Sequence, residues 1–138
     1  MKLVFDTNVI VDVLARREPF WELSKKAMAV AARNDSIGAT TANTLTDIFY
    51  LLRKSQPDRE LLKVSLVELM DYLEVLDTTR ELCLLACQSP ITDFEDALIA
   101  ESAKRWLADY IVTRNVGDFS SSPVKAITPA ELLREIGG

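Results

Sequence analysis

Residues 1–8 read MKLVFDTN, a short apolar run that ends in three polar side chains. The run Met1–Phe5 predicts a buried β-strand that leads directly into a turn. Because acids are unusual at the end of a buried strand, Asp6 is the first candidate functional residue. The rest of the chain must supply the sheet around this strand.

Strand and helix patterns alternate along that remainder. Further strands are predicted at residues 36–39, 74–76, 110–113 and 124–127, and helices at 9–15, 19–33, 41–54, 59–72, 80–87, 93–107 and 129–136. Such alternation implies right-handed crossovers and a mostly parallel sheet covered by helices on both faces. The predicted fold class is therefore α/β, and 138 residues predict a single domain over residues 1–138.

The composition excludes several classes of active site. Of the residues, 49% are hydrophobic and 27% are charged, which is typical of a globular protein. The sequence contains no histidine, which excludes Ser-His-Asp and Cys-His nucleophile systems and any zinc site with a histidine ligand. The net charge of -5 argues against a protein that coats nucleic acid non-specifically.

Two further observations concern the cellular setting. Cys83 and Cys87 lack the spacing of a zinc site, so we expect buried free thiols in a reducing compartment. No stretch resembles a signal peptide or approaches the ~18 apolar residues of a membrane span. We therefore expect a soluble, cytoplasmic protein with no membrane contact.

Carboxylates gather where open α/β sheets place their functional sites, beyond the carboxyl ends of the strands. Asp6 follows the first strand, and Asp118 follows the fourth. Asp93 and Asp96 lie in the first turn of the helix before that fourth strand, and Asp47 lies early in the helix after the second. The predicted topology brings these acids to one edge of the sheet.

Acids gathered at one edge need a counter-charge. Two carboxylates ~5 Å apart at an effective dielectric constant of ~20 repel each other by ~3 kcal/mol. Oxygen-only ligand sets suit Mg²⁺ or Mn²⁺. A divalent cation held in this way activates water and stabilises charge at phosphorus without any histidine. The pattern therefore predicts metal-dependent chemistry.

Each acid also has an ordinary structural interpretation. Asp6 fits the cap of the next helix, and Asp93 fits an N-cap with Asp96 at the third helical position, which is the favoured interpretation for Asp93. The acids after the second and fourth strands, taken alone, fit a solvated helix surface and a turn. Spacing leaves Asp96 and its neighbour Glu95 ambiguous.

Taken together, the motifs resemble those of a known family, the PIN-domain nucleases, and most closely its compact prokaryotic VapC-like toxins. The matching stretches are Val4–Asn8, Asp93–Leu98, Asp109–Asn115 running on to Asp118 and Phe119, and the closing Ile127–Pro129. The resemblance covers essentially the whole chain. It implies a five-stranded parallel sheet in the order 3-2-1-4-5 with an acidic pocket at its centre.

Carried over position by position, the resemblance implies four catalytic acids, Asp6, Asp47, Asp96 and Asp118. Three of them are the implied ligands of Mg²⁺ or Mn²⁺, namely Asp6, Asp96 and Asp118. The implied substrate-contacting or supporting residues are Thr7, Asn8, Asp93, Thr113, Arg114 and Asn115. Relatives often carry Glu at the second position, so the shorter Asp47 is expected to reach a metal through water. Gly117 stands where relatives often carry a basic residue.

The function implied by the resemblance is metal-dependent endoribonuclease activity, as the toxin of a toxin–antitoxin pair. The implied partners are an RNA substrate, a small antitoxin protein and a second copy of the chain, with helices 19–33 and 41–54 as candidate surfaces. Rim cations that could contact phosphates are Arg16, Arg17, Arg53, Lys54, Lys104 and Arg114. Trp21 and Trp106 are expected in core or interface packing.

Three alternatives remain open. A phosphorelay receiver domain has a similar length and acidic pocket, although Asp77 is an imperfect phosphoacceptor candidate and Lys125 lies inside the last strand. A catalytically inactive PIN-like scaffold would bind RNA or protein without cutting. Structure-specific DNA cleavage is the third alternative.

Overall fold

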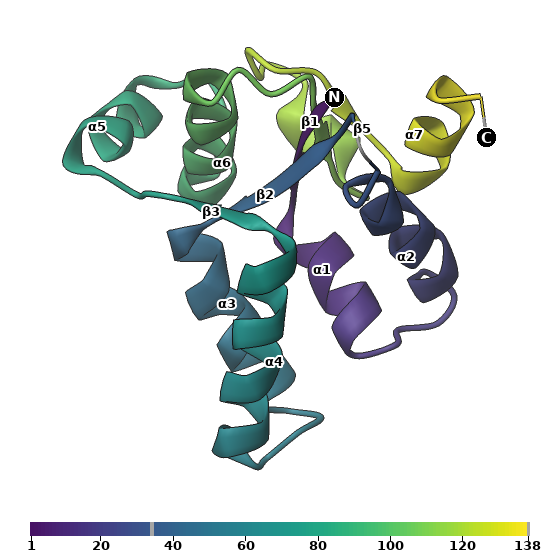
Figure 1. Cartoon of the computed structure of the whole chain (residues 1–138). Coiled ribbons are helices and arrows are strands. Elements are labelled where there is room, and N and C mark those ends of the chain that lie inside the picture. Colours follow the sequence, from purple (N-terminus) through teal and green to yellow (C-terminus); the bar gives the residue numbers. More distant parts are fainter. Residues whose placement is uncertain (34, 138) are drawn as a thin grey trace.

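Five parallel strands form one sheet at the centre of the molecule (Figure 1). The computed structural model describes residues 1–33 and 35–137. The strands, which lie in the order β3-β2-β1-β4-β5, are β1 (Lys2–Phe5), β2 (Ile37–Thr41), β3 (Glu74–Leu76), β4 (Tyr110–Val112) and β5 (Ala126–Ile127). This confirms the predicted sheet and its order. Receiver-type sheets have the order 2-1-3-4-5, so the receiver interpretation is wrong.

Helices connect the strands at nearly the predicted positions. They are α1 (Thr7–Leu14), α2 (Trp21–Val30), α3 (Ala42–Leu52), α4 (Arg59–Tyr72), α5 (Arg80–Gln88), α6 (Phe94–Arg105) and α7 (Pro129–Glu135), with a short 3-10 helix, η1 (Val116–Phe119), that was not predicted. Helix α1 begins two residues before the predicted Val9, because Asp6 caps it by accepting the Thr7 N–H at 2.8 Å.

Alternate residues of β1 supply the two halves of the core. Leu3 and Phe5 pack among the helices α1, α2, α3, α4 and α7 on one face. Val4 packs with α5 and α6 on the other face. Side chains in a strand point alternately to opposite faces, so the buried apolar run Leu3–Phe5 of β1 belongs in a sheet covered on both sides.

Gly38 lets β2 pass close to two helix ends. A Cβ atom at this position would lie 2.6 Å from Cβ of Ala31 and 2.8 Å from Cδ2 of Leu73. These residues cap α2 and α4 at their carboxyl ends. No side chain fits there without moving one of these elements.

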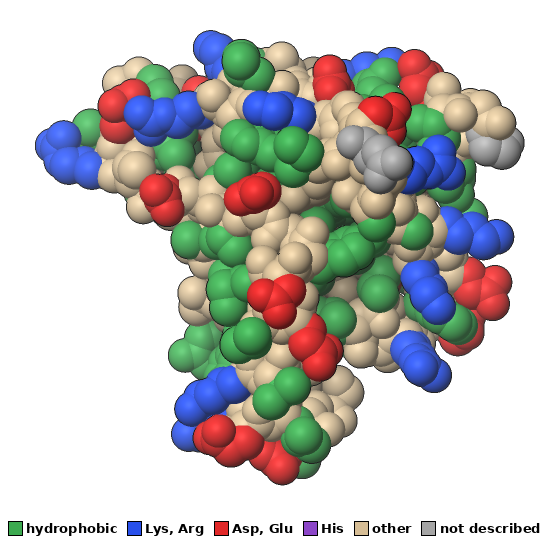
Figure 2. Space-filling view, in the orientation of Figure 1, with side chains coloured by type: hydrophobic (Ala, Val, Ile, Leu, Met, Phe, Trp, Pro, Cys, Tyr) green, Lys and Arg blue, Asp and Glu red, His purple; other side chains and the backbone are tan. Residues whose placement is uncertain are grey.

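Helices α3 and α4 project from the sheet as an arm (Figure 1). Helix α4 exposes several large apolar side chains along the arm, namely Leu61, Val64, Val67, Met70 and Tyr72. A cavity of about 320 Å³ separates α4 from α1 and α2 and is lined mainly by apolar residues such as Val13, Leu14 and Met28. Figure 2 shows hydrophobic side chains in this hollow between the arm and the body of the molecule.

Three sequence-based expectations outside the site can be compared with the structure. Cys83 and Cys87 are free, as predicted, but Cys87 is exposed and Cys83 only half-buried, so the prediction of buried thiols was wrong: both lie on the outer helix α5. Trp106 packs against the core as expected, whereas Trp21 is half-buried beneath the cations of Arg16 and Lys25. Within the described residues, no helix is both long enough and apolar enough to span a membrane.

Candidate active site

The predicted acids come from four elements whose relevant ends meet at the carboxyl edge of the sheet. Asp6 links β1 to α1, Asp47 lies in α3, Asp96 lies in the first turn of α6, and Asp118 lies in η1. Parallel strands place all their carboxyl ends at one edge, which is why residues so distant in sequence converge.

Asp6 is the most buried of these acids, with 6% of its surface exposed. Its Oδ1 accepts the Thr7 N–H at 2.8 Å, and its Oδ2 accepts the Thr113 hydroxyl at 2.8 Å and the Asn8 amide at 3.2 Å. Burial raises the pKa of Asp6, and the nearby charge of Asp118 adds to the increase, although the hydrogen bonds from Thr113 and Thr7 oppose it. The carboxylate is therefore firmly oriented, and it forms no ion pair within residues 1–33 and 35–137.

Asp93 and Asp96 divide the roles of capping and site formation. Asp93 caps α6, because its Oδ1 accepts the Asp96 N–H at 2.9 Å, which confirms the favoured structural interpretation. Asp96 lines a cavity of about 540 Å³ together with Asp93 and the exposed Asp118. Burial raises the pKa of Asp96 to about 7, with further contributions from the charges of Asp6, Asp93 and Asp118.

Glu95 also belongs to the site, which spacing alone left ambiguous. A hydrogen bond with Asp47 is the main cause that raises the pKa of Glu95 to about 8, followed by burial and by the charges of Asp47, Asp93 and Asp6. Two carboxyl groups can share a hydrogen bond only if one carries a proton. Oδ2 of Asp47 is buried and has no hydrogen-bond partner within the described part of the chain. The site therefore disfavours the charged form of Glu95.

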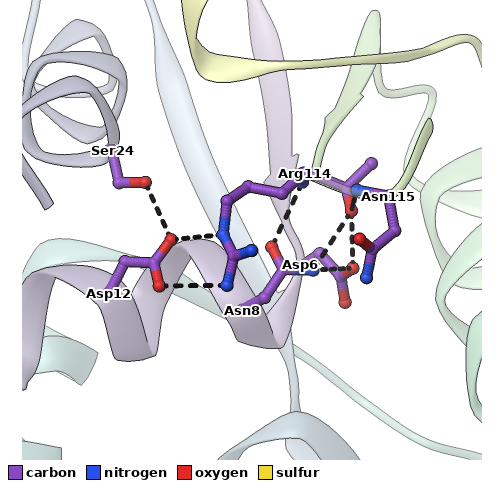
Figure 3. Close-up of polar contacts among 7 residues, drawn as sticks. Asp6, Asn8, Asp12, Ser24, Arg114 and Asn115 are labelled. Carbon is purple, nitrogen blue, oxygen red and sulfur yellow. Dashed lines mark hydrogen bonds and ion pairs between the residues drawn. The ribbon is translucent and has the colours of Figure 1, made fainter. Parts of the chain in front are cut away.

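Arg114 does not face the pocket with a free guanidinium group. Its Nε donates to Oδ2 of Asp12 at 2.7 Å and its Nη2 donates to Oδ1 at 3.2 Å. Asp12 is fully buried and also accepts the Ser24 hydroxyl at 3.2 Å. The guanidinium group lies over the Phe20 ring, 3.9 Å from its centroid. Figure 3 shows this fork beside the Asp6 group.

Sequence reasoning missed Asp12. The available signal was an acid in the middle of the apolar helix VIVDVL, four residues after Asn8 and hence on the same helix face. An acid at such a position needs a buried partner. The sequence did not identify that partner, because Arg114 lies about a hundred positions away along the chain.

The other polar residues implied by the resemblance surround Asp6 in different ways. Asn8 and Thr113 contact it directly, whereas the exposed Asn115 donates its N–H to Thr113 Oγ1 at 3.0 Å. Thr7 contributes its N–H to Asp6, and its hydroxyl oxygen is buried without a partner among the described residues. Arg114, in contrast, forms its ion pair with Asp12 and not with Asp6.

Several suggested rim cations lie away from the pocket. Arg53 and Lys54 follow the carboxyl end of α3, and Lys104 lies in the last turn of α6. Both helices rise about 1.5 Å per residue, so Arg53 lies about 9 Å along α3 from Asp47 and Lys104 about 12 Å along α6 from Asp96. The amphipathic patterns of residues 41–54 and 93–107 predict which face of each helix is buried, but not which end of the helix lies at the site.

A divalent cation suits the donors that are present. Among the ion pairs of residues 1–33 and 35–137, none involves Asp6, Asp47, Asp93, Glu95, Asp96 or Asp118. Buried oxygens of Asp47 and Thr7 lack partners, and the available ligands are oxygens, as Mg²⁺ and Mn²⁺ prefer. Within the described residues, no three acidic or cysteine side chains lie close enough together to form a preformed metal site. The donor set therefore suits a hard divalent cation of the Mg²⁺ or Mn²⁺ type.

Comparisons with known proteins agree with this geometry. A family model described as PIN domain matches residues 2–117. No curated protein matches the chain.

Similar solved structures include a chain of VapBC2 from Rickettsia felis bound to a DNA fragment from its promoter, with 20% identity over 93% of this chain and 98% of that one and a TM-score of 0.70. VapBC-1 from nontypeable Haemophilus influenzae is 20% identical over 94% of this chain and 99% of that one, with a TM-score of 0.69.

Mycobacterium tuberculosis VapC20, described as a sarcin-ricin loop cleaving toxin, is 15% identical over 79% of this chain and 86% of that one, with a TM-score of 0.64. These structures share the fold of this chain. Because the family model spans most of the sequence and the acids converge as its motifs imply, the chain belongs to the PIN-domain family of nucleases.

Proposed function

We propose that this protein is an endoribonuclease that hydrolyses RNA phosphodiester bonds with Mg²⁺ or Mn²⁺. The observation that carries the proposal is the convergence of Asp6, Asp96 and Asp118, which have no ion-pair partner within the described structure. The charge of Asp118 contributes to the raised pKa of both Asp6 and Asp96, and the charge of Asp6 contributes to that of Asp96. Such a cluster is costly unless protons or a cation neutralise it.

Each acid has a distinct part in this proposal. Asp6, Asp96 and Asp118 would hold the cation, and the shorter Asp47 would reach it through a water. When bound, a divalent cation supplies a water nucleophile at neutral pH and stabilises the charge that develops on the phosphate. Ligands must be deprotonated before they bind a metal, so the raised pKa of Asp96 implies tighter metal binding as the pH rises through about 7.

The residues around Asp6 would keep its carboxylate in a productive orientation. Thr113 and Asn8 both donate to Oδ2 of Asp6. These two hydrogen bonds fix the orientation of the carboxylate and hence the directions of its free lone pairs. The cavity beside Asp96 and Asp118 would receive the substrate strand, and the open space around Gly117 leaves room there. RNA is the favoured substrate class because the similar VapC20 is described as cleaving the sarcin-ricin loop.

We further propose that the protein is a toxin with an antitoxin partner and that it forms homodimers in the cytoplasm. The similar structures include VapBC toxin–antitoxin complexes. The apolar hollow between α4 and the helices α1 and α2 is a candidate surface for one of these partners. Of the two helices suggested by the sequence, α2 lines this hollow, whereas α4 was not suggested and exposes more apolar surface.

The test is cleavage of total RNA by the purified protein with Mg²⁺, with Mn²⁺ and with chelator, alongside single- and double-stranded DNA. Asp96→Asn removes one acid of the site, and Asp71→Asn, on the exposed face of α4, is the control with the same change of charge. We expect discrete RNA fragments that require metal, vanish with Asp96→Asn and persist with Asp71→Asn.

Other outcomes would select among the alternatives. Binding of RNA without cleavage at micromolar protein would favour the inactive scaffold, and cleavage of DNA alone would favour a structure-specific deoxyribonuclease. An activity that survives both chelator and Asp96→Asn would refute the proposed site.

A further inference from the structure

Arg114 is held at two points, one turn of α1 apart. Its guanidinium group binds Asp12, and its backbone N–H donates to Oδ1 of Asn8 at 3.2 Å. Asn8 and Asp12 are four residues apart and share one face of the helix. The end of β4 is thereby fastened along α1 by a single residue (Figure 3).

This fastening determines which end of the Asn8 amide faces Asp6. Because Oδ1 of Asn8 accepts from Arg114, its Nδ2 is directed to Oδ2 of Asp6 at 3.2 Å and to Thr113 Oγ1 at 3.4 Å. An asparagine amide carries a donor at one end and an acceptor at the other. With the amide reversed, an acceptor oxygen would face the carboxylate of Asp6 and repel it.

The ion pair is built to hold its position. Asp12 is fully buried, and the Arg114 side chain is 25% exposed. Ser24 donates to the same Asp12 oxygen as Nε of Arg114, and Phe20 covers the guanidinium group. A guanidinium group committed to a bidentate pair and an aromatic face has little freedom to bind a phosphate as well.

We propose that Asp12 and Arg114 form a positioning pair that acts through Asn8 to orient the Asp6 carboxylate for the metal. Arg114 is thus a positioning residue and does not contact the phosphates of the substrate. The inference rests on the proposed metal site and extends it to residues that have no contact with the metal.

A double-mutant cycle on Mn²⁺ binding tests this route. The Kd for Mn²⁺ is measured by calorimetry for the wild type, Arg114→Lys, Asn8→Ala and the double variant, each first shown to be folded by its melting curve. Arg114→Lys retains the charge but loses the planar fork. Residues that orient metal ligands typically change metal affinity by about 10–100-fold, and we expect each single variant to weaken binding within that range.

The double variant decides between a route through Asn8 and an independent effect. If Arg114 acts through Asn8, the double variant binds Mn²⁺ no more weakly than Asn8→Ala alone. Losses that multiply would overturn the inference, as would wild-type affinity in Arg114→Lys. A wild type that binds no Mn²⁺ would instead remove the proposed function, and this inference with it.

Two further variants guard against trivial explanations. Arg105→Lys is the matched control, because Arg105 forms an exposed pair with Glu81 at the other end of α6 from Asp96; it should bind Mn²⁺ as the wild type does. Asp12→Asn keeps the side-chain shape and approaches the same pair from its other side, should Arg114→Lys not fold. Its loss of affinity should likewise disappear in the Asn8→Ala background, and a loss that persists there would overturn the inference.

Cleavage kinetics supply an independent readout. A positioning role lowers kcat by about 10–100-fold with KM nearly unchanged. A phosphate contact would instead raise KM and reduce the salt dependence of binding by about one unit of slope. The second pattern in Arg114→Lys would overturn the inference.

Discussion

Asp6 and Asp12 lie six residues apart on the same strand-to-helix segment, both are buried, and their surroundings differ in kind. Asp12 is matched by the Arg114 guanidinium group and the Ser24 hydroxyl. Asp6 has hydrogen-bond donors but no ion-pair partner within the described residues, and the charge of Asp118 contributes to its raised pKa. A buried acid with a fixed cation depends on that partner, whereas one without a fixed cation leaves a charge that protons or a bound cation could neutralise.

Removing Asp12 should have the largest effect on stability. Asp12→Ala leaves the Arg114 charge without its partner in a largely buried position, and breaking such a pair costs about 3–5 kcal/mol. Urea unfolding monitored by circular dichroism measures the loss. The control Asp71→Ala on exposed α4 should stay within about 0.5 kcal/mol of the wild type. Equal losses of stability for Asp12→Ala and Asp71→Ala would contradict a structural role for the Asp12 ion pair.

Asp6→Asn should show the opposite pattern. It removes a carboxylate whose raised pKa reflects an unfavourable charge, so the melting temperature of the metal-free protein should be retained or increased. Metal-dependent cleavage should fall by about 100-fold or more. Initial rates on RNA together with melting curves in chelator separate the two effects. A large loss of stability with retained activity would assign Asp6 the role of Asp12.

Stability of the metal-free protein should depend on pH through the site acids. The pKa values of Asp6, Glu95 and Asp96 are raised in the folded state, so folding binds protons above the unfolded pKa of about 4. The stabilisation from these protons is complete below that pH and is lost as the pH rises through about 7 and about 8, the folded pKa values of Asp96 and Glu95. Melting temperatures in chelator should therefore fall from pH 5 to pH 9.

Two comparisons sharpen this pH prediction. Asp96→Asn should flatten the fall, because the substituted amide does not titrate. Added Mg²⁺ should raise the melting temperature more at pH 8.5 than at pH 5.5, since the cation replaces the lost protons. A melting temperature that rises steadily with pH in chelator would show that the acids are not as closely coupled as their geometry indicates.

The smallest effect concerns the support of Asp12. Ser24→Ala removes one hydrogen bond to a charged acceptor and leaves the ion pair in place. A loss of about 1–2 kcal/mol in the free energy of unfolding is expected, measured by the same urea titration. An unchanged stability would mean that Arg114 alone satisfies the buried carboxylate.

The periodic pattern located the elements well and their ends less well. The predicted helix 59–72 and strand 74–76 agree with α4 and β3, because a capping Asp58 and a clear apolar pattern mark that part of the chain. The last strand is shorter than predicted, since β5 pairs with β4 only at Ala126 and Ile127. Strand ends are set by the neighbouring strand, which the local sequence does not contain.

The site was only partly predictable, because some of its contacts also join elements that are distant in the sequence. Asp6, Asp96 and Asp118 follow from motifs that mark the carboxyl ends of strands or the start of a helix. The roles of Glu95 and Arg114 depend on Asp47 and Asp12, each contributed by a different element. Spacing within one segment carries no information about a partner that arrives from another.

The sequence by itself determined the α/β class, the exclusion of histidine-based chemistry and the acids that motifs place at the sheet edge, because residue type and local periodicity act over a few positions. Only the tertiary structure decided which of the two buried acids is paired with a cation of the protein. That choice depends on whether a cation is brought within about 3 Å in space, and Arg114 meets Asp12 and not Asp6 because the end of β4 lies along α1.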